Sequence, residues 1–350
     1  MKIKAPAGIK TRDQAKTKIT MPGKDYASDQ EIRWCPGCGD YSILKQVQAV
    51  LAEVNVPREE TVFISGIGCS SRFPYYMNTY GMHSIHGRAT AIASGLRAIR
   101  RDLNIWIITG DGDGLSIGGN HLIHLLRRNF NVNILLFNNE IYGLTKGQYS
   151  PTSPIGTINK TAMWGTIDSP FNPLALALGA DASFVARGLD VDPQLLRNVL
   201  KRANDHKGAS FVEIYQNCNV FNDGAFSIYT DKSFKKENTL TLEHSKPLIF
   251  GNLEDKGIKL DGLKPVIVSL SNGISQDELW IHDETDPTKA SILSRFSHDP
   301  KFPRPLGVLY AIQRPAYEDL LHEQKEKAYN QGGKPDLFTL FKGKNSWEVH

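Results

Sequence analysis

The sequence predicts an α/β fold in which a mostly parallel sheet carries helices on both faces. Apolar segments that favour strands alternate, from about residue 40 to 215, with segments whose apolar residues recur at helical spacing. The candidate strands are almost continuously apolar, as in strands that are buried on both faces. A chain of 350 residues with 40% apolar and 9% aromatic residues can also fill a large core.

The elements follow one another in a regular order. Asp40 is a suitable cap for a first helix. The apolar positions of this helix are Ile43, Leu44, Val47, Val50 and Leu51. The later candidates are strand 61–65, helix 89–101, strand 104–109, helix 118–128, strand 132–138, the apolar segments 173–180 and 183–187, helix 193–204 and strand 210–215. Because ligands bind at the carboxyl ends of parallel strands, the loops after these strands are the candidate sites.

The pattern divides the chain into three predicted parts. Residues 1–28 form a polar, basic N-terminal arm, and residues 29–228 form the domain with the alternating pattern. Residues 229–350 form an irregular extension that packs on this domain or on a partner. Within the extension, 264–270 is a possible strand, whereas the Pro-rich segment 302–319 fits no element clearly.

Charge and targeting features narrow the function classes. The chain has 41 Lys and Arg against 37 Asp and Glu, and the basic residues are scattered, so we expect no nucleic-acid partner. The N-terminal arm lacks the apolar core of a secretory signal, and the longest apolar run is too short to cross a membrane. We therefore expect a cytoplasmic protein. Because the cytoplasm is reducing, the four cysteines indicate metal or redox chemistry rather than structural disulfides.

Two motifs at strand ends predict a site for a metal and a diphosphate. Asp111 lies among glycines in ITGDGDGLSIGGN, and Asn139 lies in LFNNEIYGL after the next strand. Their side chains and the carbonyl of Ile141 would supply the hard oxygen ligands that Mg²⁺ prefers. The glycine-flanked helix start at 116–120 offers backbone N–H groups to phosphate oxygens. The alternative is a pair of ordinary tight turns.

Five segments together resemble one enzyme family. They are WCPGCGD, ISGIGCSSR, SIHGRATAIASGLR, ITGDGDGLSIGGNH and NNEIYGLTKGQYSPTS. Their order and spacing are similar to those of the β subunit of 2-oxoacid:ferredoxin oxidoreductases, especially the 2-oxoglutarate type, over roughly residues 30–225. The resemblance implies a thiamine diphosphate-binding fold.

The resemblance also assigns roles to particular residues. It implies Mg²⁺ ligands at Asp111, Asn139 and the carbonyl of Ile141. It implies thiamine diphosphate contacts at Ile67, Gly68, Cys69, Ser70, Gly112, Asp113, Gly143 and Leu144, and His86 is a further candidate. It implies that Arg72, Leu144 and Lys146 handle the substrate, with Arg72 meeting the 2-oxoacid carboxylate. The alternative is that these three, and His86, are ordinary packing or surface residues.

The four cysteines have a common explanation. Cys35 and Cys38 form a local pair, whereas Cys69 and Cys218 are single residues in loops that follow strands. On a parallel sheet these loops can meet at one end. Four thiolates suit a 4Fe-4S cluster, and the resemblance places one cluster on these four positions. A structural zinc site, a redox dithiol or buried free thiols are the alternatives.

The implied reaction is the coenzyme A-dependent oxidative decarboxylation of 2-oxoglutarate to succinyl-CoA and CO₂, or its reverse, with electrons passing through the cluster to ferredoxin. The implied partner is an α subunit, in an αβ or (αβ)₂ assembly, because the chain shows no second α/β domain to supply the carboxylate that thiamine needs. Pyruvate or broad-range enzymes share the same motifs. A non-oxidative thiamine decarboxylase subunit and an iron-sulfur electron carrier are alternatives of other kinds.

Overall fold

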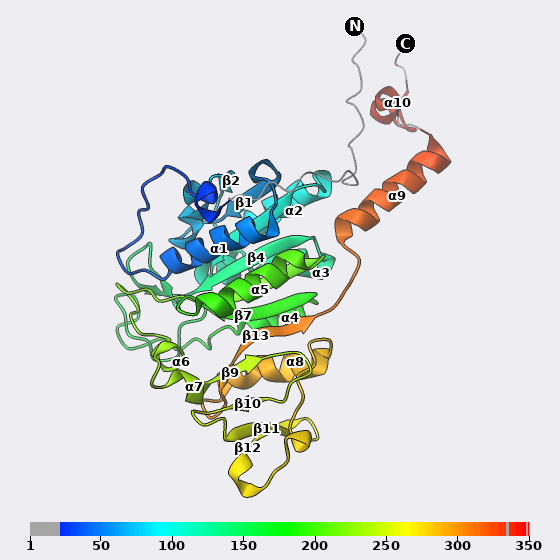
Figure 1. Cartoon of the computed structure of the whole chain (residues 1–350). Helices are drawn as coiled ribbons and strands as arrows, with labels where there is room; N and C mark the ends of the chain where they lie inside the picture. The colour runs from blue at the N-terminus through cyan, green and yellow to red at the C-terminus, as the bar shows by residue number, and fades with distance from the viewer. Residues whose placement is uncertain (1–21, 334–335, 348, 350) are drawn as a thin grey trace.

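An eight-stranded sheet forms the centre of the molecule in the computed structural model, which describes residues 22–333, 336–347 and 349 (Figure 1). The strand order is β2-β1-β3-β4-β8-β7-β13-β9. In chain order these strands are β1 (Thr61–Ser65), β2 (Tyr80–His83), β3 (Asn104–Gly110), β4 (Val132–Asn138), β7 (Phe184–Leu189), β8 (Ala209–Tyr215), β9 (Thr239–Leu242) and β13 (Arg304–Ala311). Neighbours within the series β2-β1-β3-β4-β8-β7 all pair in parallel. Strand β13 pairs antiparallel with β7 and parallel with β9. The prediction of an α/β fold with a mostly parallel sheet is confirmed.

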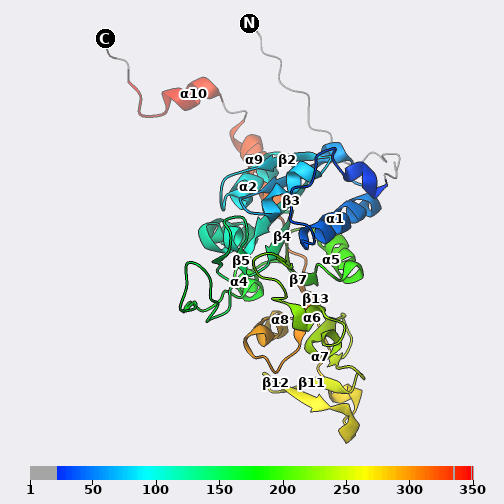
Figure 2. The ribbon, with the colours of Figure 1, turned by 90° about the vertical axis from the view of Figure 1, so that its left-hand side faces the viewer.

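Helices cover both faces of this sheet. Figure 2 shows α1 (Asp40–Val54) and α5 (Pro193–Asp205) on one side of the strands, with α2 (Ala89–Ile99) and α4 (Pro173–Gly179) on the other. Helices α3 (Gly119–Arg128) and α8 (Pro287–Ser294) pack on the same side as α2 and α4. The predicted helices of residues 40–205 are thus present, with ends that differ by a few residues.

The strands are apolar throughout because each one contributes to two cores. In β3, Trp106 and Ile108 lie in the core beneath α1 and α5, whereas Ile105 and Ile107 lie in the core beneath α2 and α3. All four side chains are essentially inaccessible to solvent. The alternation of side chains along a strand therefore divides one apolar run between the two faces.

The parallel pairing brings four loops to one edge of the sheet. Ser65 pairs with Ile108, Gly110 pairs with Phe137, and Asn138 pairs with Tyr215, so β1, β3, β4 and β8 end at nearly the same level. The loops that follow these strands contain the metal and diphosphate motifs of the sequence, together with Cys69 and Cys218. The register of the sheet therefore assembles the candidate site.

The C-terminal region takes part in the main sheet through β9 and β13. The short helices α6 (Ser227–Thr230) and α7 (Lys235–Asn238) precede β9. Between β9 and β13 lie α8 and a separate antiparallel sheet of β10 (Ile249–Phe250), β11 (Lys256–Asp261) and β12 (Lys264–Ser269). The chain ends with α9 (Tyr317–Gly332), which leads away from the body in Figure 1, and α10 (Leu337–Lys342). The possible strand at 264–270 corresponds to β12.

The sequence pattern did not predict β2, β9 or β13 of the main sheet, and β13 is the longest of these three strands. It lies in the Pro-rich segment, and a register shift between Val308 and Tyr310 interrupts the regular alternation of its side chains. Pro305 is tolerated because it lies next to the start of the strand. Residues 1–21 of the predicted N-terminal arm lie outside the residues that the structure describes.

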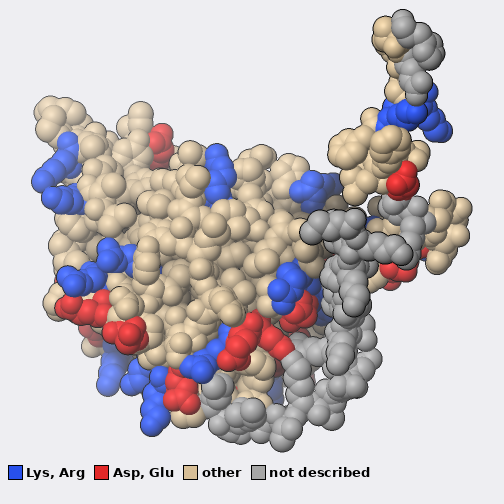
Figure 3. Space-filling view, turned by 90° about the horizontal axis from the view of Figure 1, so that it is seen from above, with Lys and Arg blue, Asp and Glu red and all other residues tan. Residues whose placement is uncertain are grey.

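Surface properties are unremarkable for a chain of nearly balanced charge. On the face seen in Figure 3, Lys and Arg side chains lie interspersed with Asp and Glu side chains rather than in one patch. In the described part of the chain, no helix combines the length and apolar character that crossing a bilayer requires.

A buried ion pair links two central strands near the candidate site. Arg187 of β7 and Glu213 of β8 are direct neighbours in the sheet, and the Arg187 Nε atom lies 2.7 Å from Glu213 Oε2. Each side chain is only 1% exposed. Asn138 donates to the other oxygen of Glu213 over 2.8 Å, and the Arg187 guanidinium lies 4.9 Å from the centre of the Tyr215 ring. The pair therefore fixes the end of β4 as well as the pairing of β7 with β8.

We expect Glu213→Leu to lower the free energy of unfolding by about 3–5 kcal/mol, because it leaves the buried Arg187 charge uncompensated. The double variant Arg187→Met with Glu213→Leu should recover much of this loss, since no buried charge remains. Denaturant unfolding followed by circular dichroism measures both. The control is Glu53→Gln, which breaks an exposed pair with Arg197 (3.7 Å) and should cost less than about 1 kcal/mol. Equal losses in Glu213→Leu and the control would contradict the expectation.

Candidate cofactor site

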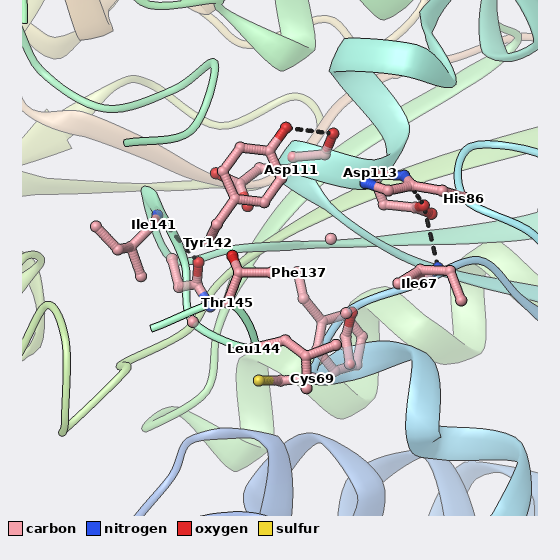
Figure 4. Close-up of a pocket in the computed structure, with 16 residues that line it drawn as sticks. Ile67, Cys69, His86, Asp111, Asp113, Phe137, Ile141, Tyr142, Leu144 and Thr145 are labelled. Atoms are coloured by element: carbon pink, nitrogen blue, oxygen red, sulfur yellow. Dashed lines mark hydrogen bonds and ion pairs between the residues drawn. The ribbon is translucent and has the colours of Figure 1, made fainter. Parts of the chain in front are cut away.

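A pocket of about 540 Å³, partly open to solvent, lies where the loops after β1, β3 and β4 meet (Figure 4). Its lining includes the predicted cofactor and metal residues Ile67, Gly68, Cys69, Ser70, His86, Asp111, Gly112, Asp113, Asn139, Ile141, Gly143 and Leu144. Gly110, Phe137, Tyr142 and Thr145 complete it. Arg72 and Lys146 lie outside this lining: Arg72 donates to the Tyr76 hydroxyl over 3.1 Å, and Lys146 is exposed.

Asp111 is a buried carboxylate at the end of β3. Its Oδ2 atom accepts hydrogen bonds from the Ser150 and Thr152 hydroxyls, each over 2.5 Å. Burial raises the pKa of Asp111 to about 6, although both hydroxyls oppose the shift. No cation is among the groups that act on it. A divalent cation bound here would compensate the buried charge, so the donor set fits Mg²⁺.

Asn138, the last residue of β4, and Asn139, which follows it, have different roles because successive side chains point to opposite sides of a strand. Asn139 lines the pocket, and its Nδ2 atom donates to Gln216 over 2.9 Å. Asn138 points into the sheet, where it donates to Glu213 and accepts from Thr152. The sequence pair Asn-Asn therefore supplies one side chain to the pocket and one to the structure beneath it.

Glu140 is a third acidic group in this region that the sequence motifs did not single out. It has a positive φ of 57°. Burial, with the nearby charge of Asp111, raises the pKa of Glu140 to about 8. The charge of Arg304 opposes this shift but does not outweigh burial.

Asp113 joins the loops that surround the pocket. Its Oδ1 atom accepts from the backbone N–H groups of Ile67 (3.1 Å) and Gly87 (2.7 Å), and the Nδ1 atom of His86 lies 2.7 Å away. Its Oδ2 atom accepts from the Thr109 hydroxyl over 2.6 Å. Figure 4 shows His86 and Ile67 directed at this carboxylate. Asp113 thus holds the β1 loop and the start of α2 in place around the pocket.

Glycines allow two of these groups to approach the backbone. A Cβ atom on Gly66 would lie 1.9 Å from Asp113 Oδ2, and one on Gly112 would lie 2.2 Å from the Tyr142 ring. The Tyr142 hydroxyl donates to the Gly112 carbonyl over 3.0 Å. Tyr142 was not among the predicted site residues, because its contact depends on the short hairpin of β5 (Ile141–Tyr142) and β6 (Gln148–Tyr149).

The four cysteines are free thiols in loops at the same edge of the sheet. A Cβ atom placed on Gly143 would lie 3.5 Å from the Cys218 sulfur and 3.6 Å from the Cys69 sulfur, so both flank this glycine. Burial, followed by the charges of Asp40, Cys218 and Cys35, raises the pKa of Cys69 to about 12. The charges of Cys218 and Cys69 likewise contribute to the raised pKa of Cys38, after the larger effects of burial and Asp40.

Among the described residues, no group of three or more Cys, His, Asp or Glu side chains is placed so that it could hold a metal ion. The predicted 4Fe-4S cluster on the four cysteines therefore stays a prediction.

Gln216 lies between the metal motif and the cysteines, and sequence analysis did not identify it. Its Nε2 atom donates to the Cys38 sulfur over 3.2 Å and to the Asn217 carbonyl over 2.7 Å. Nearby, Asn222 donates to the Asn139 carbonyl over 2.9 Å, and its N–H donates to the carbonyl of Cys218. A polar residue directly after the predicted strand 210–215 is the sequence signal that could have identified Gln216.

Asp40 differs from its predicted role as a helix cap. The residue at the helix start is Gly39, and Asp40 lies buried in the first turn of α1. A Cβ atom on Gly39 would lie 1.9 Å from Asp190 Oδ2, so only glycine fits there. Burial and the Asp190 charge raise the pKa of Asp40 to about 7. Close packing of the cysteine loop on Asp190 thus replaces capping by Asp40.

Comparison with known proteins identifies the kind of domain that forms this pocket. Residues 66–214, from the loop after β1 to β8, match the family described as thiamine pyrophosphate enzyme, C-terminal TPP binding domain. This range contains the metal motif and the pocket lining. The fold and the cofactor domain that the motifs predicted are therefore confirmed.

Curated relatives are similar over most of the chain. Subunit KorB of a 2-oxoglutarate oxidoreductase from Mycobacterium tuberculosis is 50% identical over 98% of this chain and 91% of its own length. Subunit KorB of a 2-oxoglutarate synthase from Methanocaldococcus jannaschii is 37% identical over 67% of this chain and 89% of its own length. The β subunit of 2-oxoacid:ferredoxin oxidoreductase 1 from Aeropyrum pernix is 39% identical over 68% of this chain and 74% of its own length.

A solved structure has a similar fold. The 2-oxoglutarate:ferredoxin oxidoreductase from Magnetococcus marinus, with 2-oxoglutarate, coenzyme A and succinyl-CoA bound, superposes with a TM-score of 0.73 at 33% identity. The similarity covers 92% of this chain and 94% of the chain from Magnetococcus marinus.

We expect Gly66→Ala to destabilise the chain by about 1–3 kcal/mol, because the new methyl group displaces Asp113 and deprives the Ile67 and Gly87 N–H groups of their acceptor. The control, Gly95→Ala, lies at an open position within α2 and should stabilise the chain by about 0.8–1 kcal/mol. The midpoint temperature of thermal unfolding should therefore fall for Gly66→Ala and rise for Gly95→Ala. A shift in the same direction would show that Asp113 does not depend on the space at Gly66.

Proposed function

This chain belongs to the β-subunit family of the 2-oxoacid:ferredoxin oxidoreductases, and we propose that its own reaction is the coenzyme A-dependent oxidative decarboxylation of 2-oxoglutarate to succinyl-CoA and CO₂, or the reverse carboxylation. It is a subunit of an oxidoreductase. The 2-oxoglutarate named in the relatives from Mycobacterium tuberculosis and Magnetococcus marinus supports this substrate over pyruvate.

One observation carries the proposal: the pocket combines the buried carboxylate of Asp111, which neutral donors rather than a cation accompany, with Cys69, which belongs to a group of four cysteines. Asp111, Asn139 and the Ile141 carbonyl would hold Mg²⁺ and, through it, the diphosphate of thiamine diphosphate. Asp113 holds the surrounding loops, so Gly68, Gly112 and Gly143 can present backbone to the cofactor. When bound, thiamine diphosphate supplies the nucleophilic carbon for 2-oxoacids, and a 4Fe-4S cluster accepts the released electrons singly.

Three residues at the edge of the pocket would act on the substrate. Arg72 lies close enough to Cys69 for its charge to act on that thiol, which supports a role in attracting the 2-oxoacid carboxylate. Leu144 is half exposed at the pocket and can contact the substrate side chain. Lys146 is exposed on the β5–β6 hairpin, where it can meet a second charged group of substrate or coenzyme A.

Four cysteines would hold one 4Fe-4S cluster beside the pocket. Cys69 lines the pocket and also belongs to this group, so the cluster and thiamine diphosphate would be neighbours. Cys35 is the exposed member, which makes its side of the cluster a short route to ferredoxin. Electron transfer to ferredoxin distinguishes this enzyme from a non-oxidative decarboxylase.

The active unit requires an α subunit. Within the described residues, the acidic side chains that line the pocket are Asp111 and Asp113, and protein donors engage both of them. The carboxylate that activates the thiamine ring therefore comes from another chain. We propose an αβ or (αβ)₂ assembly in the cytoplasm.

The test of this function is a coenzyme A-dependent dye-reduction assay of the anaerobically purified αβ complex on a panel of 2-oxoacids. We expect reduction with 2-oxoglutarate and much slower reduction with pyruvate. Activity on pyruvate without activity on 2-oxoglutarate would overturn the substrate. A complex that lacks iron and the visible absorption of a cluster would overturn the electron route.

We also expect Asp111→Asn to weaken binding of thiamine diphosphate in the presence of Mg²⁺ by at least about tenfold. Even the loss of a residue that only supports a metal ligand typically lowers metal affinity by this factor. The control is Asp102→Asn near the other end of β3, where Asp102 pairs with Arg100 on the surface. Isothermal titration of the αβ complex measures both. Unchanged affinity in Asp111→Asn would contradict the metal site.

A further inference from the structure

One buried side chain contacts both of the proposed cofactor sites. Gln216 is 1% exposed and directly follows β8. On one side its Oε1 atom accepts from Asn139 Nδ2 over 2.9 Å, and on the other side its Nε2 atom donates to the Cys38 sulfur over 3.2 Å. Its backbone N–H also extends the sheet by donating to the Asn138 carbonyl over 2.9 Å. The side chain is therefore held between a predicted metal ligand and a predicted cluster ligand.

The orientation of the Gln216 amide is determined by its partners. Nε2 donates to the Asn217 carbonyl over 2.7 Å, and a carbonyl can only accept. If the amide were reversed, its oxygen would face this carbonyl and its nitrogen would face another donor, the Nδ2 atom of Asn139. Only one orientation satisfies all three partners, so an N–H group points at the Cys38 sulfur.

We propose that Gln216 is a positioning residue that serves both cofactors, by orienting Asn139 for Mg²⁺ and by donating a hydrogen bond to the cluster ligand Cys38. This proposal rests on the function proposed above. It adds to that function a direct physical link between the site where electrons are released and the site that accepts them.

The link to the metal works through the amide of Asn139. Because Gln216 accepts from Asn139 Nδ2, the other end of the amide, Oδ1, is the atom left to face the metal, next to the Ile141 N–H that donates to it over 3.2 Å. Partners that orient a metal ligand typically change metal affinity by about 10–100-fold. Loss of the acceptor at Gln216 frees Asn139 to rotate away from the metal.

The link to the cluster works through charge. A reduced cluster carries one more negative charge than the oxidised cluster, and hydrogen bonds to its sulfur ligands stabilise that charge. The Gln216 N–H therefore raises the reduction potential of the cluster. Its removal shifts the potential to more negative values and makes the cluster a weaker electron acceptor.

The main experiment compares Gln216→Met with wild type in the anaerobically purified αβ complex. Methionine keeps the length of the side chain but provides neither the N–H nor the oxygen. We expect the affinity for Mg²⁺, measured by titration at fixed thiamine diphosphate, to fall about tenfold. In a redox titration followed by electron paramagnetic resonance, we expect the equilibrium constant for one-electron reduction of the cluster to fall about tenfold. This corresponds to a reduction potential that is more negative by about 59 mV.

Gln46→Met is the matched control. Gln46 is also a buried glutamine (3% exposed), but it accepts hydrogen bonds from Arg197 on α5 and contacts neither predicted cofactor site. It reports the general cost of replacing a buried amide by a thioether. We expect lower thermal stability with unchanged metal affinity and potential.

Gln216→Glu separates the two links. In either protonation state glutamate keeps an oxygen that accepts from Asn139 Nδ2, so Mg²⁺ affinity should return to within about threefold of wild type. A failure of glutamate to restore the affinity lost in Gln216→Met would overturn the metal link. A cluster potential in Gln216→Met equal to that of wild type would overturn the cluster link. Absence of any cluster signal in the wild-type complex would instead overturn the proposed function, and this proposal with it.

Discussion

The parallel pairing of β1, β3, β4 and β8 is the constraint on which the rest of the molecule depends. Because these strands point the same way and end at one level, loops more than 100 residues apart in sequence meet at one edge of the sheet. The site could not be assembled from one contiguous segment, since Cys38 comes before the first strand and Gln216 follows the last of these four. The apolar strands, divided between two cores, provide the rigid base that keeps these loops in register.

The sequence was sufficient to identify pocket residues that have a strong local signal. Asp111 and Asn139, each of which follows an apolar strand within a short polar turn, line the pocket, as does Cys69. Their roles as ligands stay predictions. Ser150, Thr152 and Gln216 were not identified, since they are common polar residues whose roles exist only after distant loops converge. Strand β13 was missed for a related reason: prolines and a register shift hide an apolar run whose partners are far away in the chain.

The electrostatics of the pocket depend on groups at different depths. Asp113 is surrounded by hydrogen-bond donors, whereas Asp111 has two hydroxyl donors and no cation, and Glu140 lies near its charge. Beneath them, within the sheet, the charge of Arg187 neutralises that of Glu213. The buried charges of these two residues are therefore paired, whereas neutral hydroxyl donors rather than a cation accompany Asp111 at the pocket. This imbalance lies at the place where a cation and a diphosphate would bind. The protein thus separates the charges that stabilise its fold from those that are available to a ligand.

The opposite directions of Asn138 and Asn139 have a consequence for the evolution of this chain. One residue faces the sheet and the other the pocket, so an insertion or deletion of a single residue within β4 would exchange their positions. Asn138 would then face the pocket and Asn139 the sheet, so the hydrogen bonds to Glu213 and Gln216 would each have to be made by the other asparagine. The roles of the two side chains therefore depend on the length of β4 as well as on their identity.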